Sequence, residues 1–119
     1  MIKNVLDASA VIAYLYSETG ADKVEPLLEN SIISRINATE VLTKLVHDNL
    51  TVEEAKETFD KLNLEIVDFD EDQSLKAAEL RPLTKHLGLS LGDRCCLALA
   101  IVKNLPAVTA DKNWASLSF

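Results

Sequence analysis

Four acidic residues lie beside apolar segments at widely separated places in this sequence of 119 residues. Asp7 directly follows the apolar run IKNVL, and Asp111 comes just past a second short apolar run. Glu40 and Asp93 fall in the first turns of predicted helices. In an open α/β sheet the ligand site lies beyond the carboxyl ends of the strands. The placement therefore predicts that the four acids meet at one edge of a sheet.

Four clustered carboxylates would repel one another and raise each other's pKa. A divalent cation removes that repulsion, and Mg²⁺ or Mn²⁺ prefers oxygen ligands while keeping several of its waters. Such an ion orients a water, lowers its pKa and neutralises charge on a phosphoryl oxygen. The residue types thus predict a Mg²⁺ or Mn²⁺ site that hydrolyses a phosphodiester bond.

Each acid also has an interpretation that needs no shared site. Asp7 and Asp93 stand where a helix N-cap is expected, and Asp111 suits a turn. Glu40 suits a solvated first turn, where the helix dipole favours a negative charge. Taken singly these interpretations are the stronger ones, and only the joint placement of the four acids favours a metal site.

Short apolar runs alternate with helical segments along the chain, and this alternation defines the expected fold. Strands are expected over residues 2–6, 31–36, 64–69 and 106–109. Helices are expected over residues 8–17, 20–29, 38–49, 52–63, 71–87 and 91–103. The expected helix signals are a cap at Asn37, a capping box of Thr51 with Glu54, a kink or break at Pro82 and a stop at Gly88. The alternation predicts an α/β fold, a central parallel sheet flanked by helices in three layers, in a single domain over residues 1–119.

Composition limits the classes of function. The net charge of −7 argues against a broad, charge-driven grip on nucleic acid, so a polyanionic substrate would need metal ions or a local basic patch. No apolar run reaches the length of a membrane span, and the N-terminus lacks the basic region of a signal peptide. We therefore expect a cytoplasmic protein with no membrane contact. Cys95 and Cys96 are adjacent, which suits buried thiols in a reducing compartment rather than a disulfide.

Four segments of the chain match the motifs of a known family: VLDASAVIAYL, NATEVLTKL, LSLGDRCCLALA and AVTADKNWASL. Each segment carries one acid, and in order these are Asp7, Glu40, Asp93 and Asp111. Over essentially its whole length the chain resembles a PIN-domain ribonuclease of the VapC toxin type. The resemblance implies a PIN-like fold and a Mg²⁺- or Mn²⁺-dependent endoribonuclease that acts as the toxin of a type II toxin–antitoxin pair.

The resemblance also implies roles for individual residues. Asp7 and Asp93 would be the principal metal ligands, whereas Glu40 and Asp111 would bind metal directly or through water and help to position the attacking water. Two hydroxyl residues would support the site, although a helix-start hydroxyl and a strand-end residue are also ordinary at these positions. They are Ser9 and Thr109.

The implied partners are an RNA substrate, a small antitoxin protein and a second copy of the chain in a homodimer. The antitoxin would lay its C-terminal segment over the acidic pocket and present an arginine to the carboxylates. Arg94, next to Asp93, is expected either to contact a phosphate or site carboxylate, or to be a surface charge beside a helix cap.

Two other functions fit the same architecture. A catalytically silent PIN-like module would keep the fold and only hold a partner, and the retention of all four acids argues against it. A phospho-receiver signalling domain would need a pair of adjacent acids after the first strand and a lysine after the fifth. Only Asp7 follows the first strand, so the receiver fits poorly.

Overall fold

The computed structural model describes residues 1–110, and within them one parallel sheet forms the centre of the molecule. Its strands lie in the order β3-β2-β1-β4, and each neighbouring pair is parallel. The strands are β1 (Asn4–Leu6), β2 (Ser31–Ser34), β3 (Glu65–Val67) and β4 (Ala107–Val108). The predicted α/β fold with a central parallel sheet is confirmed.

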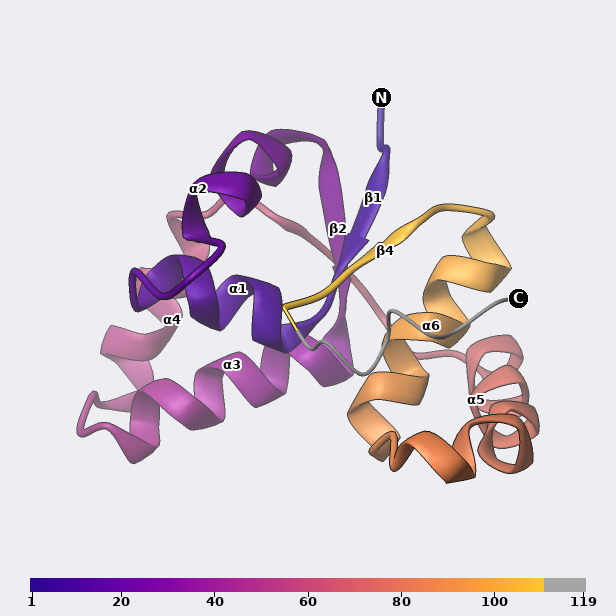
Figure 1. Cartoon of the computed structure of the whole chain (residues 1–119). Coiled ribbons are helices and arrows are strands. Elements are labelled where there is room, and N and C mark those ends of the chain that lie inside the picture. Colours follow the sequence, from indigo (N-terminus) through magenta and orange to yellow (C-terminus); the bar gives the residue numbers. More distant parts are fainter. Residues whose placement is uncertain (111–119) are drawn as a thin grey trace.

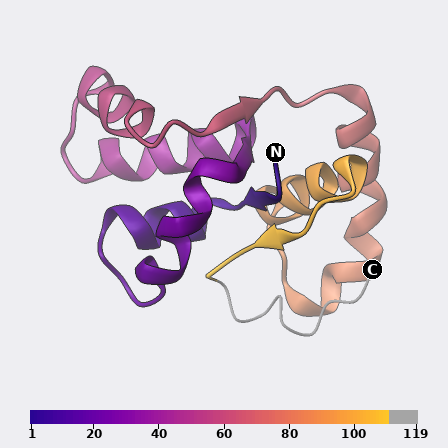
Figure 2. The same ribbon diagram turned by 90° about the horizontal axis from the view of Figure 1, so that it is seen from above.

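Helices cover both faces of this sheet. They are α1 (Ala8–Leu15), α2 (Ala21–Val24), α3 (Arg35–His47), α4 (Val52–Asp60), α5 (Glu71–Thr84) and α6 (Leu91–Lys103). The first four lie on one side of the strands, and α5 and α6 lie on the other (Figures 1 and 2). None of the helices within residues 1–110 is long and apolar enough to cross a membrane.

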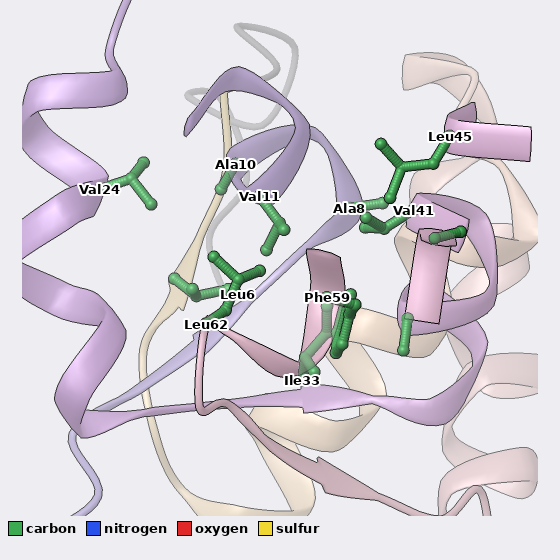
Figure 3. Close-up of a cluster of buried hydrophobic side chains, with 12 residues drawn as sticks. Leu6, Ala8, Ala10, Val11, Val24, Ile33, Val41, Leu45, Phe59 and Leu62 are labelled. Carbon is green, nitrogen blue, oxygen red and sulfur yellow. The ribbon is translucent and has the colours of Figure 1, made fainter. Parts of the chain in front are cut away.

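The alternation of side chains along β1 and β2 creates a core on each side of the sheet. Leu6 and its neighbour Ile33 face the first four helices, where Val11 and Phe59 pack against them (Figure 3). Val5 and Ile32 face the opposite way, toward α5 and α6. The residues buried on that second side are Val5, Ile32, Leu80, Leu89, Cys96, Leu97, Leu99 and Ala100.

The start of α3 differs from its prediction. The strand expected over residues 31–36 ends at Ser34, whose hydroxyl accepts a hydrogen bond from the Ile36 backbone N–H and caps the helix. The helix therefore begins at Arg35, and the predicted cap at Asn37 is wrong because a second good capping residue precedes it. Asn37 lies inside the helix and is buried.

Other local signals behave as their chemistry predicts. The capping box of Thr51 and Glu54 is present at the start of α4. Gly88 adopts a φ of +67°, the left-handed conformation that ends a helix. Pro82 lies inside α5, which ends at Thr84 and continues as a 3₁₀ turn over Lys85–Leu87. The helix expected over 20–29 is α2 followed by a 3₁₀ segment, Glu25–Asn30, with a proline in its first turn.

Two leucines in the helices of the second side test this packing. Leu99 in α6 is fully buried, whereas Leu75 in α5 is 62% exposed. We expect Leu99→Ala to lower the free energy of unfolding by about 2–5 kcal/mol, since it leaves a cavity. Leu75→Ala should change it by less than about 0.5 kcal/mol. Equal losses in urea-induced unfolding would contradict the assigned core.

Candidate functional site

Asp7 connects β1 to α1 and is the most enclosed acid of the site, with 2% of its surface exposed. Its Oδ1 accepts a hydrogen bond from the Ala10 backbone N–H at 2.8 Å, which makes it the N-cap of α1. Its carboxylate also accepts hydrogen bonds from the hydroxyls of Ser9, at 2.8 and 2.9 Å, and Thr109, at 2.5 Å. Thr109 follows β4, so Asp7 is held between the carboxyl ends of neighbouring strands.

The environment of Asp7 disfavours its charged form. Burial raises the pKa of this carboxyl above its ordinary value, and the negative charge of Asp93 adds to the shift. The hydrogen bonds from Thr109, Ala10 and Ser9 act in the opposite direction but do not cancel the effect of burial. An ionised Asp7 is therefore a group that a nearby cation would stabilise.

Asp93 lies in the first turn of α6 and is half-buried. Its Oδ2 accepts a hydrogen bond from the Ser90 backbone N–H at 3.0 Å, and its own N–H donates to the Ser90 hydroxyl at 3.1 Å. Ser90 is thus the N-cap of α6, and Asp93 completes a capping box with it. The bond fixes one carboxylate oxygen beside the helix N-terminus.

Glu40 is the sixth residue of α3, one turn further along the helix than the sequence predicts, because α3 begins at Arg35. Its side chain is exposed, yet its Oε1 accepts a hydrogen bond from Asn37 Nδ2 at 2.8 Å. The same nitrogen donates to the Gly92 carbonyl oxygen at 3.0 Å. These two bonds hold the Glu40 carboxylate against the start of α6, next to Asp93.

Gly92 accommodates this approach because it has no side chain. A Cβ atom at this position would lie 2.3 Å from Glu40 Oε2 and 2.6 Å from Oε1. Such distances are far inside a van der Waals contact, so any larger residue would displace the carboxylate. Neither Gly92 nor Asn37 is among the site residues predicted from the sequence. The available signal was a glycine inside the first turn of a predicted helix, directly before an acid.

The thiol of Cys96 in α6 is affected by the charges of all three acids. Burial is the main reason that its pKa lies well above the ordinary value, and the charges of Asp7, Asp93 and Glu40 raise it further. Within residues 1–110, however, no three His, Cys, Asp or Glu side chains lie close enough to share one metal ion. The fourth predicted acid, Asp111, lies outside the described residues.

The three acids fit a hard divalent cation by their chemistry. They supply carboxylate oxygens, the ligands that Mg²⁺ and Mn²⁺ prefer. Burial raises the pKa of Asp7, so a cation would stabilise its ionised form, and the space left at Gly92 admits the Glu40 carboxylate beside the start of α6. A cation bound among them would relieve the repulsion that the fold imposes.

Arg94 points away from these acids. Its Nη1 donates a hydrogen bond to the Ala77 carbonyl oxygen of α5 at 2.9 Å. Its Nε is buried and has no hydrogen-bond partner in the part of the chain that the structure describes. The guanidinium group thus joins α6 to α5.

A hollow of about 560 Å³ runs along α3 and includes Glu40 in its lining. The lining residues are Ile36, Thr39, Glu40, Thr43, Lys44 and His47. Lys44 Nζ lies 3.3 Å from Asp48 Oδ2 and 5.4 Å from the centre of the Tyr16 ring. The Tyr16 hydroxyl donates to the same carboxylate, which raises the pKa of Tyr16 to about 12. The hollow therefore leads from Glu40 toward Lys44, whose charge is partly neutralised by Asp48.

The approach of Glu40 to Gly92 predicts a coupling between the two positions. In a Glu40→Ala background, Gly92→Ala should raise the free energy of unfolding by up to about 1 kcal/mol, because alanine favours a helix more than glycine does. In the wild-type background the gain should shrink or reverse, since the new methyl group must displace the carboxylate. Equal effects in the two backgrounds, measured by urea unfolding, would contradict the close contact.

The raised pKa of Asp7 predicts a pH-dependent stability in the presence of a chelator. The folded-state pKa lies above the ordinary aspartate value of 3.8, so the folded protein loses stability relative to the unfolded chain as pH rises through the folded pKa. Asp7→Asn removes this penalty. The unfolding free energy of the variant minus that of the wild type should increase with pH above 3.8 and level off beyond the folded pKa.

Asp72→Asn is a matched control for this measurement, because Asp72 is an exposed acid in the first turn of α5. Because the Asp72 side chain is exposed, the stability difference between this variant and the wild type should stay nearly constant as pH rises. A constant difference between Asp7→Asn and the wild type across this range would show that burial does not perturb Asp7.

Comparisons with known proteins agree with this architecture. The toxin–antitoxin complex from Klebsiella pneumoniae is 22% identical over 97% of this chain and 92% of that chain, with a TM-score of 0.73. VapBC2 from Rickettsia felis was solved bound to a DNA fragment from its promoter. It is 24% identical over 98% of this chain and 93% of that chain, with a TM-score of 0.73.

VapC20 from Mycobacterium tuberculosis, described as a sarcin-ricin loop cleaving toxin, has a TM-score of 0.78. It is 14% identical over 98% of this chain and 96% of that chain. Identities this low establish a shared fold. No curated protein matches the sequence.

A family model provides the assignment that these structures alone do not. The model of the PIN domain matches residues 5–119, which include all four predicted acids. The chain belongs to the PIN domain family.

Proposed function

We propose that this protein is a metal-dependent endoribonuclease that acts as the toxin of a type II toxin–antitoxin pair. The observation that carries the proposal is the gathering of Asp7, Glu40 and Asp93 around the start of α6 in a PIN domain. The structural neighbours support the toxin role, since their descriptions name toxin–antitoxin complexes and a toxin that cleaves the sarcin-ricin loop.

The proposed metal is Mg²⁺ or Mn²⁺. Asp7 and Asp93 would be its principal ligands, and Glu40 and Asp111 would bind it directly or through water. When bound, such an ion lowers the pKa of a water molecule and neutralises charge on a phosphoryl oxygen.

The protein's own groups would orient the reactants. The hydroxyls of Ser9 and Thr109 and the N–H of Ala10 hold the Asp7 carboxylate in one orientation. Ser90 does the same for one oxygen of Asp93. Glu40 is exposed to solvent and held at one oxygen, so it can position the attacking water with the other.

The hollow along α3 is the proposed path of the RNA strand beside the acids. It leads from Glu40 past Lys44 to His47, so that a phosphate next to the cleaved bond would meet a lysine. A local cation such as Lys44 is consistent with the net charge of −7, which argues against binding through a broad basic surface. We propose no base sequence, because RNA recognition depends on loops and shape.

The proposed partners follow from the same family. A small antitoxin would cover the acids with its C-terminal segment and present an arginine to the carboxylates. The protein would act in the cytoplasm, where its RNA substrate is found, and would form a homodimer.

The second candidate is a catalytically silent PIN module that only holds a partner. One observation favours it: the three acids in residues 1–110 do not converge closely enough to share a metal ion. The two candidates differ in metal binding, because a module that has lost activity has no need of a cation at these carboxylates.

Cleavage of RNA tests the proposal. Purified protein with Mn²⁺ should cut RNA, and chelation of the metal should stop it. Asp7→Asn and Asp93→Asn should each lower the cleavage rate by about 100-fold or more, because each replaces a charged ligand of the proposed metal ion, which would supply the charge stabilisation. Asp72→Asn should leave the rate unchanged. The readout is the appearance of fragments of a labelled RNA on a gel.

Calorimetry separates the two candidates. Wild-type protein that fails to bind Mn²⁺ would contradict the nuclease and favour the silent module. Cleavage that persists equally in Asp7→Asn and Asp93→Asn would show that a contaminating nuclease produces the fragments.

A further inference from the structure

We propose that Asn37 is a positioning residue that holds the Glu40 carboxylate at the acid cluster. The inference rests on the proposed function and adds a residue that the family motif of four acids does not include. Asn37 contacts no expected substrate atom, so its effect would be exerted through Glu40.

The bonds of Asn37 fix the direction of its amide group. An amide nitrogen has two N–H donors, and Asn37 Nδ2 donates to Glu40 Oε1 at 2.8 Å and to the Gly92 carbonyl oxygen at 3.0 Å. Both partners are acceptors, so the opposite orientation of the amide would set Asn37 Oδ1 against two acceptor oxygens. One side chain therefore ties the acid of α3 to the backbone of α6.

Stability alone does not explain an asparagine at this position. Asn37 is 1% exposed, and its Oδ1 is buried without a hydrogen-bond partner in the described part of the chain. A buried polar atom without a partner destabilises a protein. The neighbouring buried residues Ala38 and Val41 are apolar, so an apolar residue would suit the surroundings better.

Gly92 is a second observation that points to the same carboxylate. A glycine in a helix is less stable than an alanine, yet any Cβ at Gly92 would overlap Glu40. Asn37 and Gly92, on different helices, are both less stabilising than an apolar residue or an alanine would be. Asn37 donates a hydrogen bond to the Glu40 carboxylate, and Gly92 leaves space for it. Both residues therefore serve to fix the position of the Glu40 carboxylate.

Electrostatics explains why Glu40 needs a tether. Its carboxylate is exposed at the end of a flexible side chain, and Asp7 and Asp93 carry the same charge nearby. Repulsion would turn an unrestrained carboxylate toward solvent. The hydrogen bond from Asn37 keeps Glu40 beside the other acids before any cation arrives.

The test is Mn²⁺ binding measured by calorimetry on the variant Asn37→Leu, which has a similar size and no donor. We expect the variant to fold, with a thermal unfolding midpoint near or above that of the wild type. Its Mn²⁺ affinity should fall by about 10–100-fold, the usual effect of losing a group that orients a metal ligand. Asn37→Ala also lacks the donor and adds neither bulk nor charge, so its Mn²⁺ affinity should fall by a similar factor.

Gln73→Leu is the matched control. Gln73 is also a buried amide, 1% exposed, whose Nε2 donates to the Asp68 carbonyl oxygen at 2.9 Å. Its Oε1, like that of Asn37, is buried without a partner within residues 1–110. It lies in α5, away from the acids, and its replacement should leave Mn²⁺ affinity unchanged.

A double-mutant cycle shows whether Asn37 acts through Glu40. In a Glu40→Ala background, Asn37→Leu should cause almost no further loss of Mn²⁺ affinity. Equal losses in the two backgrounds would overturn the inference while leaving the nuclease proposal intact. Absence of Mn²⁺ binding by the wild type would instead overturn the proposed function.

A measurement without metal tests the positioning role of Asn37 even if the wild-type protein does not bind Mn²⁺. The ¹³Cδ resonance of Glu40 should shift in Asn37→Leu, because its carboxylate loses a hydrogen bond, and should not shift in Gln73→Leu. An unchanged resonance in Asn37→Leu would overturn the positioning role whether or not metal binds.

Discussion

Repulsion between carboxylates is the constraint on which the arrangement of this site depends. Burial, with a further contribution from the charge of Asp93, raises the pKa of Asp7, and the charges of Asp7, Asp93 and Glu40 all raise the pKa of the Cys96 thiol in α6. A separate donor restrains each acid: a pair of hydroxyls for Asp7, the Ser90 backbone for Asp93 and the Asn37 amide for Glu40. The donors set the acids in place, and the repulsion that remains is what a cation would relieve.

The short strands and the two cores make this crowding possible. Asp7 follows β1, α3 begins directly after β2, and Thr109 follows β4, so three carboxyl ends of the sheet contribute to one edge. Apolar residues on opposite faces of β1 and β2 anchor α1 and α3 on one side and α6 on the other. The continuous buried run Cys95–Ala100 anchors α6 directly after its first turn.

Sequence patterns predict those parts of the molecule that depend on local chemistry. The apolar runs mark the four strands, and the capping signals at Asp7, Thr51 and Gly88 place the ends of helices. The contact of Asn37 with Gly92 and that of Arg94 with Ala77 join residues far apart in sequence, and no local pattern encodes them. The error at the start of α3 has a local cause, since Ser34 and Asn37 are both good caps and only packing chooses between them.

If each acid is only a helix cap or a turn residue, its hydrogen bonds are explained. The loss of stability caused by placing charged and polar groups at these positions is not. A cap at Asp7 could be a serine, which would carry no charge into a buried position. A capping box at Asp93 would work as well with the larger acid that occupies it in α4. A buried asparagine with an unpaired oxygen and a helical glycine add two further departures from stable local choices, within one turn of the same acids. Natural proteins depart from such choices mainly at functional sites, so these three departures, at Asp7, Asn37 and Gly92, favour a shared site over independent caps and turns.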